Sequence, residues 1–142
     1  MNEMEYAVSR KIIQLGNQIV ARRNRQIREL GLTTEQADAL FFFQKYPGWS
    51  AADLKKHLGI SHQAARGIVE RLAGKGFLEL RVSEEDARYK KVFLTEKGET
   101  VCEKMKRNGS HTGSRLLKGM TEEERKAFCA MIDLALKNAG VT

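Results

Sequence analysis

The segment Ser50–Lys75 reads SAADLKKHLGISHQAARGIVERLAGK, and it decides the predicted fold. Ser50 is a good N-cap for a first short helix, and Asp53 places an acidic residue in its first turn. Gly59 ends that helix, because glycine tolerates the left-handed conformation that helix ends often need. After one intervening residue, Ser61 caps a second helix. Two helices with so short a connection cross steeply, as in a helix-turn-helix.

The second helix has one apolar and one polar face. Apolar residues at the spacing i, i+3, i+4 and i+7 predict a buried stripe of Ala65, Ile68, Val69 and Leu72. On the opposite face Gly67 removes bulk, so another surface can approach closely, at a cost of about 1 kcal/mol relative to Ala. His62, Gln63 and Arg66 lie in the first turns beside it. The main-chain N–H groups at a helix N-terminus can bind phosphate, and Gln and Arg side chains can hydrogen-bond to base edges. This face is therefore typical of DNA binding. The alternative is a polar face that only contacts solvent.

Composition sets the broad class. The 142 residues are 42% hydrophobic and 30% charged with a single Pro, which predicts one soluble, helix-rich domain, or a compact core with extensions. No run approaches the roughly 18 apolar residues of a membrane span, and the N-terminus lacks a signal pattern, so we expect a cytoplasmic protein. The net charge of +7 favours a polyanionic partner, although many mildly basic proteins share it.

Residues 4–30 are predicted to form one long helix. Tyr6, Ile13, Val20 and Ile27 recur every seven residues. An apolar side of this length needs something to pack on, and a partner subunit is a natural candidate.

The next helix is expected to begin at Thr33, which has the capping-box spacing to Gln36. It is expected to stop at Tyr46-Pro47-Gly48, because proline cannot continue a helix. Its inward-facing residues are predicted to be Ala37, Leu40, Phe41 and Phe43. Trp49, which follows the stop, is expected to belong to the core.

A hairpin follows the central segment. Residues 77–83 alternate in polarity and residues 90–95 read as a returning strand, with a charged tip between them. A hairpin beside a helix-turn-helix is a wing. The remainder is predicted to be helical from Glu96 to about Arg107, kinked or broken near Gly109–Gly113, and helical again from a capping box at Thr121.

Several motifs in this order resemble the MarR (multiple antibiotic resistance regulator) family of bacterial transcription regulators. The match spans about residues 31–98. Its most specific parts are Ser83-Glu84-Glu85-Asp86-Ala87-Arg88 and Val92-Phe93-Leu94-Thr95-Glu96-Lys97-Gly98. The Asp-x-Arg wing followed by a Leu-Thr-x-x-Gly helix start is specific in combination, although each piece alone is weak.

The resemblance implies a homodimer that binds a palindromic double-stranded DNA operator, most commonly as a ligand-responsive repressor. It implies three regions: an N-terminal dimerisation helix (1–31), a winged helix-turn-helix (32–98) and C-terminal dimerisation helices (99–142). The residues that would meet DNA on the recognition helix are Ser61, His62, Gln63, Arg66 and Gly67. In the wing they are Arg88, oriented by Asp86, together with Lys90 and Lys91. A narrow minor groove attracts an inserted Arg, and lysines contact phosphate.

This chain departs from the family within the recognition helix. The family usually carries a β-branched residue, Thr and Arg where this chain has Ala65, Arg66 and Gly67. The family's base preference therefore does not transfer, and the Arg66-Gly67 pair is where a particular DNA preference is expected.

Other functions find little support in the sequence. There is no phosphate loop, HExxH or nucleophile elbow, so no enzyme is predicted, and the three histidines share no metal-ligand spacing.

Cys102 and Cys129 are expected to be reduced, buried helical thiols, with redox sensing as the alternative. The family resemblance also implies a small aromatic effector, for which Tyr6, Phe42 and Trp49 are candidate lining residues. The charged run at the wing tip leaves open a protein-binding winged-helix module without DNA binding.

Overall fold

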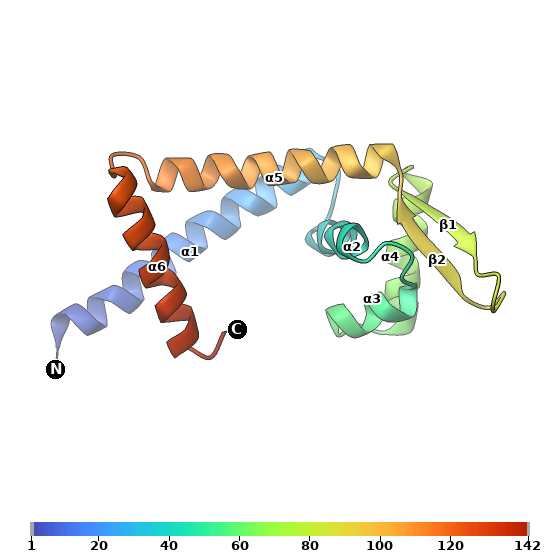
Figure 1. The fold of residues 1–142 in the computed structure, drawn as a ribbon, viewed down its shortest axis with the longest axis horizontal. Helices are drawn as coiled ribbons and strands as arrows, with labels where there is room; N and C mark the ends of the chain where they lie inside the picture. The colour runs from blue at the N-terminus through green and yellow to red at the C-terminus, as the bar shows by residue number, and fades with distance from the viewer. Residues whose placement is uncertain (1, 142) are drawn as a thin grey trace. The chain divides into compact units, whose positions relative to one another are not determined.

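The computed structural model describes residues 2–141, which form six helices and one two-stranded antiparallel hairpin (Figure 1). The helices are α1 (Glu3–Glu29), α2 (Thr34–Lys45), α3 (Ala51–Leu58), α4 (His62–Gly74), α5 (Glu96–Leu116) and α6 (Glu122–Asn138); the strands are β1 (Leu78–Val82) and β2 (Lys90–Leu94). The chain divides into two compact units, residues 1–108 and 109–142, each described by itself. The predicted fold class is confirmed: mainly α, with a hairpin wing beside a helix-turn-helix.

The helix starts lie where the capping residues predict them. The Asp53 carboxylate accepts a hydrogen bond from the Ser50 main-chain N–H at 2.8 Å, and the Ser50 hydroxyl accepts one from the Asp53 N–H at 3.3 Å. The Ser61 hydroxyl accepts a bond from the Ala64 N–H at 3.1 Å and so caps α4. Gly59 ends α3 with a φ of 66°, the left-handed conformation expected of it. Local sequence therefore sets both ends of the α3–α4 turn.

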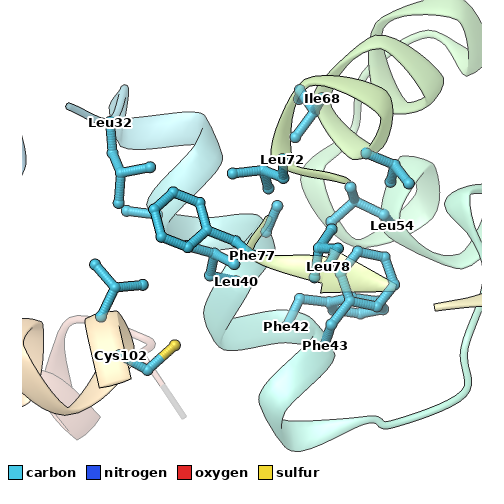
Figure 2. Close-up of a cluster of buried hydrophobic side chains, with 14 of the residues drawn as sticks. Leu32, Leu40, Phe42, Phe43, Leu54, Ile68, Leu72, Phe77, Leu78 and Cys102 are labelled. Atoms are coloured by element: carbon cyan, nitrogen blue, oxygen red, sulfur yellow. The ribbon is translucent and has the colours of Figure 1, made fainter. Parts of the chain in front are cut away.

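One apolar core holds α2, α3, α4 and the hairpin together. Leu40, Leu54 and Leu72 come from three different helices and converge in its centre (Figure 2). The predicted stripe of α4 is buried throughout: Ala65, Ile68, Val69 and Leu72. With this stripe held inside, the opposite face of α4 must point outward.

Helix α2 differs from the sequence prediction in one respect. Phe42 is buried at 4% exposure, whereas Phe41, expected inside, is only partly buried. Ala39, Leu40 and Phe43 lie on the most deeply buried side of α2, and Phe41 packs against the core from the edge of the buried surface, near Ala37. The expectation for Phe41 is therefore met only in part, because Phe41 packs against the core without being fully buried.

The wing is tied to the helices through its second strand. Leu80 pairs with Val92 across the hairpin, and the Val92 side chain is fully buried. Beyond β2, the Gly48 N–H donates to the Val92 carbonyl at 2.9 Å, and the Val92 N–H donates to the Trp49 carbonyl at 3.0 Å. These two hydrogen bonds tie the segment before α3 to β2 and fix the base of the wing.

Trp49 was expected in the core, but its side chain is 46% exposed. The Trp49 ring stacks on Tyr46 with centroids 4.2 Å apart and meets Phe42 edge-on at 5.8 Å. Its main chain is held by Val92, which places the ring on the outside of the aromatic cluster. Trp49 therefore anchors the loop from the surface.

The second unit and the end of α5 correct two more expectations. Helix α5 continues to Leu116 through Gly109 and Gly113, so the break predicted there is wrong. Each glycine costs a helix only about 1 kcal/mol, which its neighbours can offset. Cys102 is buried as expected, but Cys129 of α6 is exposed, so the prediction that both are buried fails for Cys129.

Candidate nucleic-acid interface

The outer face of α4 presents most of the predicted recognition residues to solvent. Ser61, His62, Gln63 and Arg66 are all exposed, and Gly67 is partly exposed. Ser61 is also the N-cap of α4, so its hydroxyl oxygen is engaged with the Ala64 N–H. A hydroxyl that accepts one bond still has its own hydrogen to donate. The first turns of α4 therefore offer a hydroxyl, an imidazole, an amide and a guanidinium on one surface.

The wing tip holds Arg88 by a bidentate contact with Asp86. The Arg88 Nε and Nη2 donate to the two Asp86 carboxylate oxygens, each at 3.2 Å, and the Arg88 main-chain N–H donates to Asp86 Oδ1 at 3.0 Å. The Arg88 side chain is nevertheless 89% exposed. This bidentate contact fixes the plane of the Arg88 guanidinium and leaves its other N–H groups exposed to a partner.

The same contacts explain the acidity of Asp86. Hydrogen bonds from the Arg88 side chain, and then from its main-chain N–H, lower the pKa of Asp86 below its ordinary value. The carboxylate is therefore ionised at neutral pH. Arg88 stands out from the hairpin already oriented, before any partner arrives.

The two wing lysines point to opposite faces of the hairpin. Successive strand residues alternate, so Lys90 shares a face with the buried Val92, whereas Lys91 lies on the other face opposite Arg81 in the register. Lys90 faces α4, and Lys91 faces away from it. The structure thus separates two residues that the sequence pattern treated alike.

A cleft of about 680 Å³ lies between the start of α3, the recognition helix and the wing. Four of the predicted residues line it: His62, Arg66, Arg88 and Lys90. The other five predicted residues do not line it: Ser61, Gln63, Gly67, Asp86 and Lys91. The fold therefore brings the wing arginine, one wing lysine and two recognition-helix residues to one surface, although His62 and Arg88 are 26 positions apart in the chain.

Two residues of this surface were not predicted from the sequence as binding residues. Tyr89 lines the same cleft and is 55% exposed. Glu70 also lines it and lies 3.9 Å from Arg66, one helical turn away. Tyr89 sits between Arg88 and Lys90 in the chain, and this position was the only signal for it. An exposed pair such as Arg66–Glu70 contributes little to stability, so Arg66 can exchange Glu70 for another anion.

Within residues 2–141, no three His, Cys, Asp or Glu side chains are grouped so as to hold a metal ion. None of the helices described is long and apolar enough to cross a membrane.

Known transcriptional regulators resemble this chain in sequence and in fold. A model of the MarR family matches residues 30–88, which run from the end of α1 to the wing arginine. The chain is 27% identical over 131 residues to YybA of Bacillus subtilis, an HTH-type transcriptional regulator, and the alignment covers 92% of this chain and 87% of that protein. These matches support a MarR-family winged-helix regulator.

Solved structures of MarR-family proteins share the fold. Wild-type MarR from E. coli superposes with a TM-score of 0.72 at 25% identity, covering 92% of this chain and 94% of that one. A mutant MepR of S. aureus bound to an oligodeoxyribonucleotide superposes with a TM-score of 0.78 at 19% identity, covering 93% and 97%. The likeness in fold extends over nearly the whole of this chain, including the helices outside the matched segment.

Proposed function

We propose that this chain is a MarR-family transcriptional regulator that binds double-stranded DNA in a sequence-specific manner, most simply as a repressor. The observation that carries the proposal is the juxtaposition of α4 and the wing. The exposed face of α4 and the exposed guanidinium of Arg88 border the same cleft. A helix fits the major groove, and an oriented arginine fits the adjacent narrow minor groove.

In this proposal each residue has a defined role. Gln63 and Arg66 read base edges, Ser61 and His62 contact phosphate or bases near the N-terminus of α4, and Gly67 permits close approach. Arg88 enters the minor groove and Asp86 orients it. Lys90 and Lys91 contact phosphates and set the dependence on salt.

A protein-binding winged helix without DNA binding is the less favoured alternative. The acidic run at the wing tip was its main support. Asp86 in that run is engaged by Arg88, so only Glu84 and Glu85 remain for a basic partner. The resemblance to transcriptional regulators also favours DNA.

Selection of duplexes from a random-sequence pool, followed by anisotropy titration at several salt concentrations, tests the proposal. We expect the wild type to enrich a palindrome and to bind it far more tightly than random DNA. Arg88→Ala should lose affinity for the selected duplex, whereas Lys104→Ala, an exposed cation on α5, is the control. If the wild type shows no binding even at low salt, where nonspecific binding must appear, DNA is not its partner.

We also propose that the regulator is a homodimer whose subunits join through α1 and the C-terminal helices. Large apolar side chains stay exposed along α1: Met4, Tyr6, Val8, Ile12, Ile13, Leu15, Ile19 and Val20. A second set lies on α6: Met131, Ile132, Leu134 and Leu136. Apolar surfaces of this extent mark interaction sites in soluble proteins.

Sedimentation velocity tests the dimer. The double variant Ile13→Glu, Val20→Glu places two charges on the apolar side of α1 and should sediment as a monomer. Gln14→Glu adds the same kind of charge on the polar side of α1 and should remain dimeric. A monomeric wild type at micromolar concentration would contradict the proposal.

Regulation by a small aromatic effector completes the proposed function. Its support is the aromatic cluster of Phe42, Tyr46 and Trp49, whose outer ring is half open to solvent. Trp49 is the single tryptophan of the chain, so its fluorescence reports directly on this cluster. A panel of phenolic compounds should contain one that changes Trp49 emission and weakens DNA binding over the same concentration range. If DNA affinity does not change with any such compound, no effector of this class acts here.

A further inference from the structure

We propose that Arg71 is a further DNA-binding residue, contacting phosphate on the flank of the recognition helix that faces away from the wing. This inference rests on the proposed DNA-binding function and extends it. Neither the sequence pattern nor the cleft between α4 and the wing indicates Arg71, because this residue does not line that cleft.

The first observation is where the Arg71 side chain lies. Arg71 follows Gly67 by four residues on α4, so both lie on the same side of the helix. Apart from the adjacent residues and the backbone of α4 itself, the one described atom that a Cβ added at Gly67 would meet is Arg71 Nη1, at 4.0 Å. Long helical side chains lean toward the N-terminus, and the Arg71 guanidinium does so by reaching back one turn to the edge of the bare spot at Gly67.

The second observation is that Arg66 and Arg71 flank Gly67 on opposite sides. Arg66 lies about 100° from Gly67 in one direction around the helix, and Arg71 lies about 40° from it in the other. Arg66 lines the cleft toward the wing. Arg71 therefore faces the other wall of any groove that α4 enters.

The third observation concerns charge. Arg66 has the Glu70 carboxylate at 3.9 Å, and Lys75, one turn beyond Arg71, donates to the Gly31 carbonyl at 2.8 Å and to Gln36 Oε1 at 3.3 Å. Arg71 is exposed, and among residues 2–141 no hydrogen bond or ion pair engages its guanidinium. It is thus an uncompensated positive charge on this flank of α4.

These observations point to phosphate as the ligand. A helix lying in the major groove has a phosphate strand on each side of it. On the wing side, Arg88 and Lys90 are available to one strand. On the far side, Arg71 is placed to reach the other, and the bare surface of Gly67 lets the helix sit deep enough for both strands to be contacted.

A salt titration on random-sequence duplex DNA provides the test, because a phosphate contact does not depend on base sequence. We expect Arg71→Ala to weaken binding roughly tenfold per protomer. The slope of log Kd against log salt should fall by about 0.9 per protomer, the value for one lost phosphate contact. Arg71→Lys keeps the charge and should retain most of the slope. Arg107→Ala, which removes an exposed arginine from α5, should leave affinity and slope unchanged.

The alternative outcomes separate this inference from the proposed function. If wild type and Arg71→Ala bind random DNA with equal affinity and equal slope, Arg71 makes no contact, while the DNA-binding function stands. If Arg71→Ala weakens binding only to a selected duplex, Arg71 reads bases and the phosphate assignment is wrong. If the wild type binds no DNA at low salt, both proposals fail. Alanine favours helix, so circular dichroism should show the variant folded.

Discussion

Gly98, in the first turn of α5, packs directly against the main-chain carbonyl of Phe77, and a Cβ added at Gly98 would overlap that oxygen. The Thr95 N–H also donates to the Phe77 carbonyl at 3.1 Å, and the Thr95 hydroxyl donates to the Gly76 carbonyl. The end of β2 and the start of α5 are therefore fixed on the turn that follows the recognition helix.

Gly98→Ala is expected to destabilise the protein by about 3 kcal/mol, because main-chain atoms rather than a flexible side chain must move to admit the methyl group. Denaturant unfolding followed by circular dichroism measures this change. Gly74→Ala is the matched control, since Gly74 is exposed on α4 and has nothing within 4 Å. That control should be neutral or slightly stabilising. Equal stability of the two variants would contradict the packing described for Gly98.

Gly67→Ala should separate stability from DNA affinity. The space around Gly67 is open apart from Arg71 at 4.0 Å, so the methyl group fits and the helix should gain up to about 1 kcal/mol. The same methyl group stands between α4 and the groove floor, so DNA binding should weaken. Thermal unfolding and anisotropy titration measure the two effects on the same sample. A variant that is more stable and binds as tightly as wild type would show that Gly67 does not face DNA.

Asp86→Asn tests whether Asp86 orients Arg88. The amide cannot accept two bonds from the guanidinium as a carboxylate does, so Arg88 should lose its fixed orientation. Affinity for a selected duplex should fall although the wing loses a negative charge. If Asp86 instead only repelled the DNA phosphates, its removal would raise DNA affinity. Tighter binding by the variant would therefore contradict the positioning role.

The Asp86–Arg88 contact also has a pH dependence of known sign. The Arg88 hydrogen bonds lower the pKa of Asp86 in the folded protein. The contact therefore contributes its full stabilisation of the folded state above 3.8, the ordinary pKa of the Asp86 carboxyl in the unfolded chain. Its contribution is lost as pH falls through the lower folded pKa. Between pH 5 and pH 8 we therefore expect the chemical shifts of the Arg88 side chain to be constant by NMR. A transition in those shifts near pH 6 would contradict this assignment.

The two cysteines should differ sharply in reactivity. Burial, with a smaller contribution from the Glu99 carboxylate, raises the pKa of Cys102 to about 11, so its thiol is protonated and shielded at neutral pH. Cys129 is exposed on α6. A thiol reagent such as Ellman's should modify Cys129 rapidly and Cys102 only at the rate of unfolding. The variant Cys129→Ser should therefore show no fast phase, and a fast phase in that variant would contradict the burial of Cys102.

Several features of this protein were determined by the sequence because their causes are local. The capping pairs Thr33–Gln36 and Ser50–Asp53 act within a single turn, so residue type and spacing suffice to predict them. The buried stripe of α4 follows from the helical period alone. The spacing of Asp86 and Arg88 lets a short hairpin tip join them with no help from the rest of the chain.

Other features were decided by tertiary structure because they join residues that the sequence does not relate. Lys90 and Lys91 look equivalent until packing of Val92 decides which face of the hairpin meets α4. Trp49 looks like a core residue until the pairing of its main chain with β2 leaves the ring outside. A glycine in a Leu-Thr-x-x-Gly motif is recognisable in the chain, but its reason, the Phe77 carbonyl, is a contact across 21 residues.

In the recognition helix, some features follow from local sequence and others from tertiary packing. Its period alone predicts that Arg66 and Gly67 face outward, as the structure has them. That Arg66 shares its cleft with the wing, while Arg71 lies unpaired on the other flank, depends on where the hairpin and the α1–α2 corner pack against α4. Local spacing determines which side chains a helix exposes, and long-range packing decides which exposed side chains can act together.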